Sequence, residues 1–175
     1  MPELMNIESE HVMLFVDADS CPRQLRSIIL KAVISRKVPV LFAADRPLPD
    51  VVDLVQNDGV KPEQLPLIQL AIVPEGMDSA DDFLVEKARA GMLAITRDVI
   101  LADRLATKDL VVLDDRGGVF TKETIRERLS MRNLMTALRE QGVFAEKTKP
   151  LGPREIHQFA NALDRELVKL QKNNQ

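Results

Sequence analysis

Short apolar runs alternate with helical patterns through most of this chain, and this alternation constrains the fold more than any other feature. The helical stretches carry apolar residues at the three- and four-residue spacing of an amphipathic helix. Strands that alternate with helices in this way form parallel sheets with right-handed crossovers. The sequence therefore predicts an α/β fold with a doubly wound, mainly parallel five-stranded sheet. We expect the strands within residues 12–17, 39–45, 67–74, 92–98 and 110–115, and helices within 22–36, 79–91 and 99–108.

From residue 121 onward the pattern changes to helices alone. Residues 122–142 place Ile125, Leu129, Leu134 and Leu138 on one apolar stripe, and residues 153–171 show the same periodicity. The predicted organisation is an α/β domain over 11–120, a helical extension over 121–172 packed on the same domain, and flexible termini at 1–10 and 173–175.

Composition and charge narrow the class of protein. The 175 residues include one cysteine and no apolar run long enough to cross a membrane, and we expect a cytoplasmic protein without a membrane partner. Residues 121–175 hold eleven Lys or Arg against seven Asp or Glu, so this part carries +4 and residues 1–120 carry −7. An acidic half followed by basic helices suits a metal enzyme that acts on a polyanion, although solvated helices also carry mixed charge.

Acidic residues follow three of the predicted strands. Two anions at alternate positions of an extended segment point to the same side, and we expect Asp17 and Asp19 to repel unless a cation lies between them. Carboxyl ends of parallel strands meet at one edge of a sheet, where hard oxygen ligands would suit Mg²⁺ or Mn²⁺. The candidate metal ligands are Asp17, Asp19, Asp98 and the helix-start acids Asp78, Asp81 and Asp82, with Asp114 and Asp115 as further acids near the fifth strand.

Each of these acids also has a structural interpretation. Asp19 and Asp98 could cap the helices that follow them, and Ser79 with Asp82 fits a capping box. Acids in a first helical turn favour the helix dipole whatever the function. Asp114 and Asp115 precede two glycines, a pattern typical of a sharp turn. Cys21 is expected to be a small buried hydrophobe at a helix start.

Five blocks of the sequence match a known family. They are VDADSCP, PEGMDSADDFLV, ITRDVILA, RGGVFTKETIRERLSMRN and FANALDR, spread over about residues 12–170. The chain resembles the YaiI/YqxD family of bacterial proteins, a branch of the PIN-like nuclease superfamily. The resemblance implies metal-binding and catalytic roles for Asp17, Asp98 and Asp81 or Asp82. The family often has Asn-Pro where this chain has Asp114 and Asp115, which puts a ligand role for either in doubt.

The resemblance and the acids together predict a metal-dependent nuclease that acts on RNA. A bound Mg²⁺ or Mn²⁺ would activate water and neutralise charge on a phosphodiester. Single-stranded RNA is the expected partner, held through phosphate contacts by Arg116, Arg126, Arg128 and Arg132.

Two other functions stay open at this stage. One is a non-catalytic RNA-binding or regulatory PIN-like module. The more distant one is a haloacid-dehalogenase-like phosphatase, because Asp17 and Asp19 form a D-x-D after a strand, but a clear second metal motif is missing. His11 and His157 are far apart in the sequence, which argues against a histidine-centred site.

Overall fold

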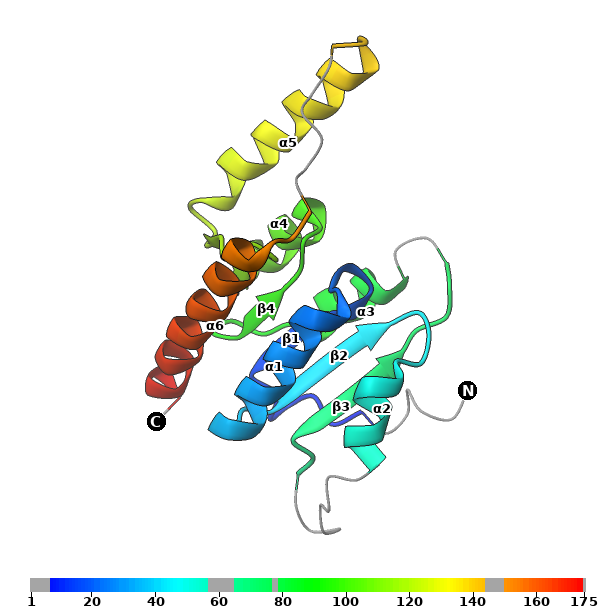
Figure 1. Cartoon of the computed structure of the whole chain (residues 1–175), viewed down its shortest axis with the longest axis vertical. Coiled ribbons are helices and arrows are strands. Elements are labelled where there is room, and N and C mark those ends of the chain that lie inside the picture. The colour runs from blue at the N-terminus through cyan, green and yellow to red at the C-terminus, as the bar shows by residue number, and fades with distance from the viewer. Residues whose placement is uncertain (1–6, 57–64, 77–78, 144–149, 175) are drawn as a thin grey trace.

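The computed structural model describes residues 7–56, 65–76, 79–143 and 150–174, and in them a six-stranded sheet carries the fold. The strand order is β3-β2-β1-β4-β5-β6, with parallel pairs throughout except for β6, which runs antiparallel to β5 (Figure 1). The strands are β1 (Leu14–Asp17), β2 (Val40–Ala44), β3 (Ile68–Ile72), β4 (Leu93–Ile95), β5 (Val111–Leu113) and β6 (Val119–Phe120). The helices are α1 (Arg23–Arg36), α2 (Pro49–Gln56), α3 (Ser79–Lys87), α4 (Val99–Thr107), α5 (Ile125–Glu140) and α6 (Pro153–Asn173).

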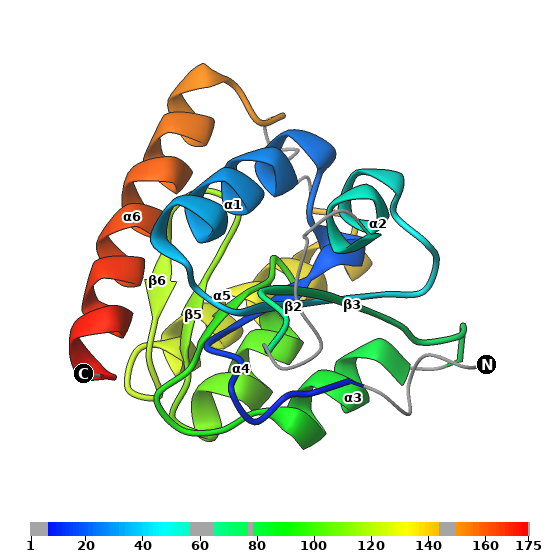
Figure 2. The ribbon, with the colours of Figure 1, turned by 90° about the horizontal axis from the view of Figure 1, so that it is seen from below.

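Helices cover both faces of the sheet (Figure 2). Alternate residues of β1 face opposite ways, so Leu14 and Val16 pack in one apolar core while Phe15 packs in the other. The first core contains side chains of α1, α2 and α6, and the second contains side chains of α3, α4 and the first residue of α5. This two-sided burial explains why β2 is apolar along its whole length and β1 is apolar up to its last residue, Asp17.

The strand order reverses direction beside β1. The chain builds β2 and β3 on one side of β1 and then returns to place β4 and β5 on the other side. In open parallel sheets, the crevice beyond the carboxyl ends of the strands at such a reversal is the usual ligand site. The segments that follow β1 and β4, and the acids on them, lie at this point.

The sequence predicted five strands, and the number was wrong. The sixth strand, β6, has two residues, too few for a periodic apolar signal, and pairs with β5 after the turn at residues 114–118. The parallel core and its predicted helices are otherwise as expected, and the eight-residue α2 is a further helix between β2 and β3.

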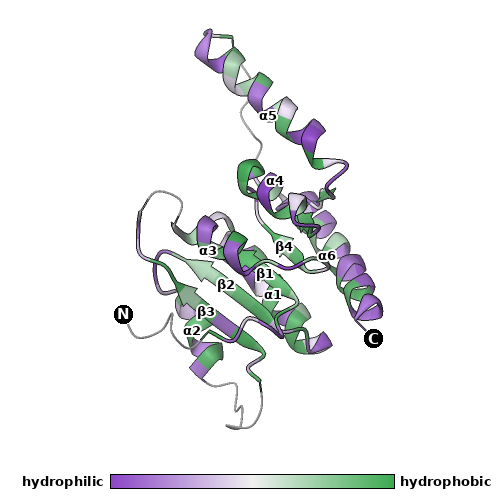
Figure 3. Ribbon diagram, turned by 180° about the vertical axis from the view of Figure 1, so that it is seen from behind, coloured by the Kyte–Doolittle hydropathy of each residue, from purple (hydrophilic) through white to green (hydrophobic). Residues whose placement is uncertain are grey.

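The two C-terminal helices behave differently. Helix α6 packs its apolar face, including Phe159, Leu163 and Leu167, into the first core. Helix α5 projects from the body of the protein (Figure 1), and of the expected apolar stripe Ile125 is buried whereas Leu134 is 53% exposed. Its projecting length mixes hydrophilic and hydrophobic residues (Figure 3).

The N-terminal segment is partly anchored. Residues 8–10 were expected within a flexible terminus, but Glu8 exchanges hydrogen bonds with the Gln69 side chain, and the Arg89 guanidinium donates to the carbonyls of Ser9 and Glu10. Residues 1–6 lie outside the described part of the chain. Among the described residues, no helix has the length and apolar character that a membrane crossing requires.

Candidate active site

Asp17 is a buried carboxylate at the carboxyl end of β1. Its side chain belongs to a residue that is 6% exposed, and Oδ2 accepts hydrogen bonds from Thr96 Oγ1 at 2.7 Å and Ser20 Oγ at 2.9 Å. Burial raises the pKa of Asp17, and the two hydroxyl donors offset only part of this effect. The negative charge of Asp98 raises the pKa further. Asp17 is thus a carboxylate whose charge the fold disfavours.

Thr96 connects Asp17 to the next strand and helix. It follows β4, is 2% exposed, and donates its backbone N–H to the Leu113 carbonyl of β5. Its hydroxyl donates to Asp17 and accepts the backbone N–H of Asp98 at 3.0 Å. On the other side, Ser20 Oγ accepts the Arg97 N–H at 3.3 Å. One continuous network therefore joins the segments after β1 and β4 at the reversal of strand order.

Asp98 caps helix α4, as one interpretation of the sequence held. Its Oδ1 accepts the N–H groups of Ile100 at 2.9 Å and Leu101 at 3.3 Å. A capping role does not exclude a second one, because the carboxylate has a second oxygen and the residue is exposed beside a cavity of about 700 Å³. Asp98 also acts electrostatically on Asp17.

The charge of Asp17 raises the pKa of Asp19, as the expected repulsion requires. The two carboxylates were expected on one side, but they bond to different segments, Asp17 to Thr96 after β4 and Asp19 to the Asp45 N–H after β2. The reason is that Ala18–Ser20 forms a 3₁₀ turn, so the alternation of an extended strand ends at Asp17. The Asp19 carboxylate accepts the Asp45 N–H at 2.9 and 3.3 Å and does not cap α1, whose N-cap is Pro22. Burial and then the negative charge of Asp45 raise the pKa of Asp19 to about 6.

The acids at the start of α3 do not belong to one group. Asp81 lines a small cavity of about 210 Å³ with Asp19, Asp45 and Glu75, on the β2 side of β1. Asp82 forms an ion pair with Arg104 of α4 at 2.8 Å. Asp78 lies outside the described residues. The expected single cluster is thus two described groups, one around Asp17 and Asp98 and one around Asp19, Asp45 and Asp81.

Asp114 serves the turn between β5 and β6. Its Oδ1 accepts the N–H groups of Arg116 at 2.9 Å and Gly118 at 2.7 Å, which closes the chain reversal. Asp115 is half-buried, and its pKa is raised by burial and then by the charge of Asp114. Both residues line the same cavity as Asp98.

A cavity of about 700 Å³ lies beside the Asp17 network. Its walls come from the segment after β4, the β5–β6 turn, the start of α5 and the residues just before α6. Arg97, Arg116 and Arg128 line it, together with Thr96, Asp98 and Phe120. Of the other predicted nucleic-acid contacts, Arg126 pairs with Asp103 at 3.5 Å and Arg132 donates to the Asn133 side chain at 3.0 Å.

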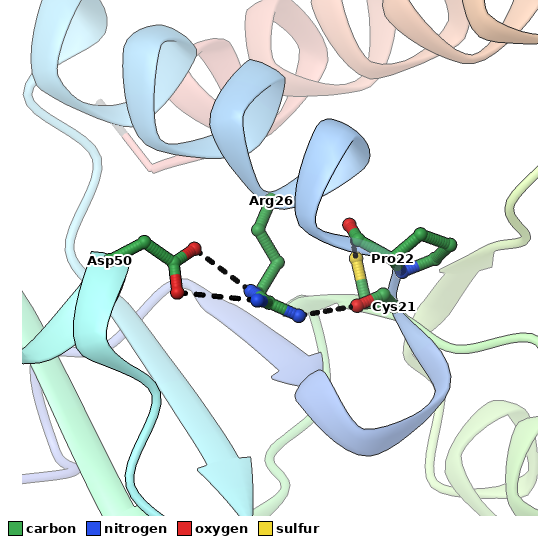
Figure 4. A network of polar contacts seen from close by, with 4 residues as sticks. All are labelled: Cys21, Pro22, Arg26 and Asp50. Carbon is green, nitrogen blue, oxygen red and sulfur yellow. Dashed lines mark hydrogen bonds and ion pairs between the residues drawn. The ribbon is translucent and has the colours of Figure 1, made fainter.

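Arg26 of α1 anchors the loop that follows β1 (Figure 4). Its guanidinium binds Asp50 of α2 through Nε at 3.0 Å and Nη2 at 3.2 Å, while Nη1 donates to the Cys21 carbonyl at 2.8 Å. Cys21 is buried as expected, and burial raises the pKa of its thiol to about 12. The Cys21 thiol is therefore protonated at neutral pH. Arg26 fixes the loop that follows Asp17 and carries Asp19 and Ser20.

The carboxylates around Asp17 suit only a metal site in which the protein supplies one or two ligands. Among the described residues, no three His, Cys, Asp or Glu side chains are placed to hold one ion. Mg²⁺, however, often takes one or two carboxylates and completes its shell with waters and substrate phosphates. Asp17 and Asp98, joined through Thr96, fit that second arrangement and not an all-protein cage.

Sequence reasoning missed Thr96, Ser20 and Asp45. Thr96 had a signal in the T-x-D segment, because a hydroxyl two residues before a capping acid lies at the end of the same strand. Asp45 had the same signal as the other acids, since it ends the second apolar run. Ser20 had no signal of its own, because its contact with Asp17 depends on the 3₁₀ turn.

Comparison with known proteins identifies the family. The model of the uncharacterized YaiI/YqxD family matches residues 15–169. A UPF0178 protein of Pseudomonas entomophila is 43% identical over 159 residues, covering 91% of this chain and 98% of its own length. UPF0178 proteins of Pseudomonas putida (strain W619) and Pseudomonas aeruginosa (strain PAO1) are each 42% identical over 91% of this chain, and over 98% and 92% of their own lengths. No solved structure matches the chain. The chain belongs to the YaiI/YqxD family.

Proposed function

We propose that this protein is a PIN-like, metal-dependent hydrolase that cleaves phosphodiester bonds in RNA. The observation that carries the proposal is the Asp17–Thr96–Asp98 network at the reversal of strand order, beside a cavity lined by arginines. Asp17 and Asp98 would hold Mg²⁺ or Mn²⁺, which when bound lowers the pKa of a water and neutralises charge on the phosphodiester.

The chain's own residues would have distinct roles in this reaction. The hydroxyls of Thr96 and Ser20 orient the Asp17 carboxylate by donating to the same oxygen, which leaves Oδ1 for a ligand. The fold disfavours the Asp17 charge, so a cation beside it would relieve an existing electrostatic cost. Arg97 and Arg116 line the same cavity and would bind the phosphate.

A cleavage assay tests the proposal directly. Labelled single-stranded and duplex RNA and DNA are incubated with the protein in Mn²⁺, in Mg²⁺ and in EDTA. We expect cleavage of single-stranded RNA that needs the metal and falls at least a hundredfold in Asp17→Asn, a loss of about 2.7 kcal/mol of transition-state stabilisation. Asp164→Asn is the matched control, because Asp164 is an exposed acid of α6 that pairs with Arg36 of α1. Cleavage that survives in Asp17→Asn would contradict the assignment.

Metal binding is measured separately by thermal unfolding. A ligand that binds only the native state raises the Tm by mass action, so millimolar Mn²⁺ should stabilise the wild type and Asp164→Asn. The increase should be lost in Asp17→Asn.

A second function, a non-catalytic RNA-binding module, is favoured by one observation. The described residues lack a cluster of three metal-ligating side chains. If RNA binds, no RNA or DNA is cleaved, and Mn²⁺ leaves the Tm unchanged, this second function replaces the first.

A further inference from the structure

We propose that the 700 Å³ cavity is a subsite for one unpaired nucleotide, with the base against Phe120 and the phosphate facing Arg97 and Arg116. This inference rests on the proposed function and deepens it, because it states which part of the RNA the protein recognises. It predicts that a base must leave any stack or pair to be bound.

The size and the position of the cavity support a single nucleotide. Small-molecule sites commonly measure about 300–1,000 Å³, and this cavity falls in that range. It opens beside Asp98, so a nucleotide bound there would present its phosphate near the Asp17 network. Elements from both halves of the chain form the walls, including Pro22 before α1 and Leu151 before α6. A duplex would have to extrude a base to fill a space enclosed in this way.

Part of the cavity lining is apolar and includes an aromatic ring. Phe120 of β6 and Val99 of α4 belong to this part, together with the buried Ala102 of α4 and Ile125 of α5. The chain has six phenylalanines and no Trp or Tyr, and Phe15, Phe42 and Phe159 are fully buried in the cores. Phe120, by contrast, is half-buried and lines the cavity. Stacking on such a ring is how proteins bind unpaired bases without strong sequence preference.

The charged residues of the lining, which we call the charged side, are Arg97, Arg116, Arg128, Asp98, Asp114 and Asp115. Arg97 and Arg116 lie near enough to Asp115 for their positive charges to act on its carboxyl group. Arg128 enters from the first turns of α5, and Asp98 and Asp114 complete the charged side. Guanidinium groups beside an apolar wall match the two ends of a nucleotide, a phosphate and a base. A sugar phosphate would use only the charged side, which makes it the informative competitor.

Calorimetric titration tests the subsite without any cleavage. The probes are the four ribonucleoside 5′-monophosphates, ribose 5-phosphate and inorganic phosphate, each titrated in EDTA and again in Mn²⁺. We expect the nucleotides to bind about tenfold more tightly than ribose 5-phosphate, the contribution of one stacked base. Phe120→Leu keeps an apolar side chain but removes the ring, and should reduce the difference to less than threefold. Arg97→Gln should weaken all the phosphate ligands, ribose 5-phosphate included.

The matched control is Phe83→Leu. Phe83 is a partly buried phenylalanine of α3 that packs on the second core and does not line this cavity. The Phe83→Leu variant should keep the tenfold preference for nucleotides over ribose 5-phosphate. If Phe120→Leu does not fold, the wild type still provides a test, because bound AMP should give NMR cross-relaxation between its base protons and the Phe120 ring.

The outcomes separate this inference from the proposed function. Equal affinity for nucleotides and ribose 5-phosphate, or no nucleotide binding in either condition, would overturn the subsite. Tight nucleotide binding that depends on Phe120, with no cleavage of RNA, would leave the subsite standing and overturn the hydrolase.

Discussion

At the scale of single residues, the Asp17 carboxyl group gives the clearest prediction. Its folded-state pKa is raised above the usual 3.8, mainly by burial, so the protein gains stability when Asp17 is protonated and loses it as pH rises through the folded-state pKa. Asp17→Asn removes that loss while keeping an oxygen that accepts from Thr96 and Ser20. At neutral pH the metal-free variant should therefore be more stable than the wild type, and a gain of about 1 kcal/mol would raise Tm by about 2–4 °C.

The pH dependence distinguishes this explanation from a simple packing effect. The advantage of Asp17→Asn should shrink as pH falls through the raised folded-state pKa of Asp17, below which the wild-type carboxyl group is itself neutral. Thermal unfolding of both proteins in EDTA between about pH 4 and 7.5 measures this difference. A lower Tm for the variant at neutral pH would mean that the carboxylate stabilises the fold, as a structural group does.

At the scale of elements, the turn between β5 and β6 depends on Gly117. Its φ is +88°, and a Cβ at this position would lie 2.8 Å from the backbone carbonyl oxygen of Gln158 in α6. Gly91 has nearly the same φ, +87°, but a Cβ there would meet nothing within 4 Å. Gly91→Ala should therefore cost only the left-handed strain of about 1–2 kcal/mol, whereas Gly117→Ala adds the displacement of α6. Urea unfolding of the two variants compares these costs, and equal losses would contradict the close approach of turn and helix.

The ion pair between Arg26 of α1 and Asp50 of α2 gives a second prediction at the scale of elements. Burial alone would raise the pKa of Asp50, but the Arg26 hydrogen bonds and charge outweigh it, and the pKa is lowered from 3.8. The pairing therefore contributes stability above about pH 4, and that contribution is lost as pH falls through the folded-state pKa. Arg26→Lys cannot make the two-point contact with Asp50 and also reach the Cys21 carbonyl, so it should cost about 1.5–3 kcal/mol at neutral pH. Urea unfolding at neutral pH and near pH 3 checks both the size and the disappearance of this cost.

The elements also show what sequence could and could not predict. The strands β1 to β5 were found because buried parallel strands leave continuous apolar runs, but the two residues of β6 leave no periodic signal. Asp17 and Asp98 were found because each follows such a run directly. The separation of Asp19 from Asp17 could not be found, because it depends on a 3₁₀ turn and on the strand that lies beside each acid.

At the scale of the whole molecule, basic side chains extend from the cavity along the projecting helix α5. Arg128 of α5 lines the cavity, and Arg132 lies four residues later, on the same face of the helix. From Arg128 to Arg132 the helix runs away from the cavity, toward the end of α5 that projects from the body (Figure 3). A strand that places one nucleotide in the cavity would thus meet both side chains as it leaves.

This path predicts how RNA binding responds to salt. Each phosphate neutralised on a single strand contributes about 0.7 to the slope of log affinity against log salt concentration. Replacing Arg128 and Arg132 with Gln should flatten the slope by up to about 1.4 and weaken binding similarly for all sequences. Arg165→Gln is the control, because Arg165 is an exposed arginine of α6. The measurement is the affinity for labelled single-stranded RNA in EDTA at several salt concentrations. An unchanged slope in the double variant would show that the basic face of α5 makes no phosphate contacts.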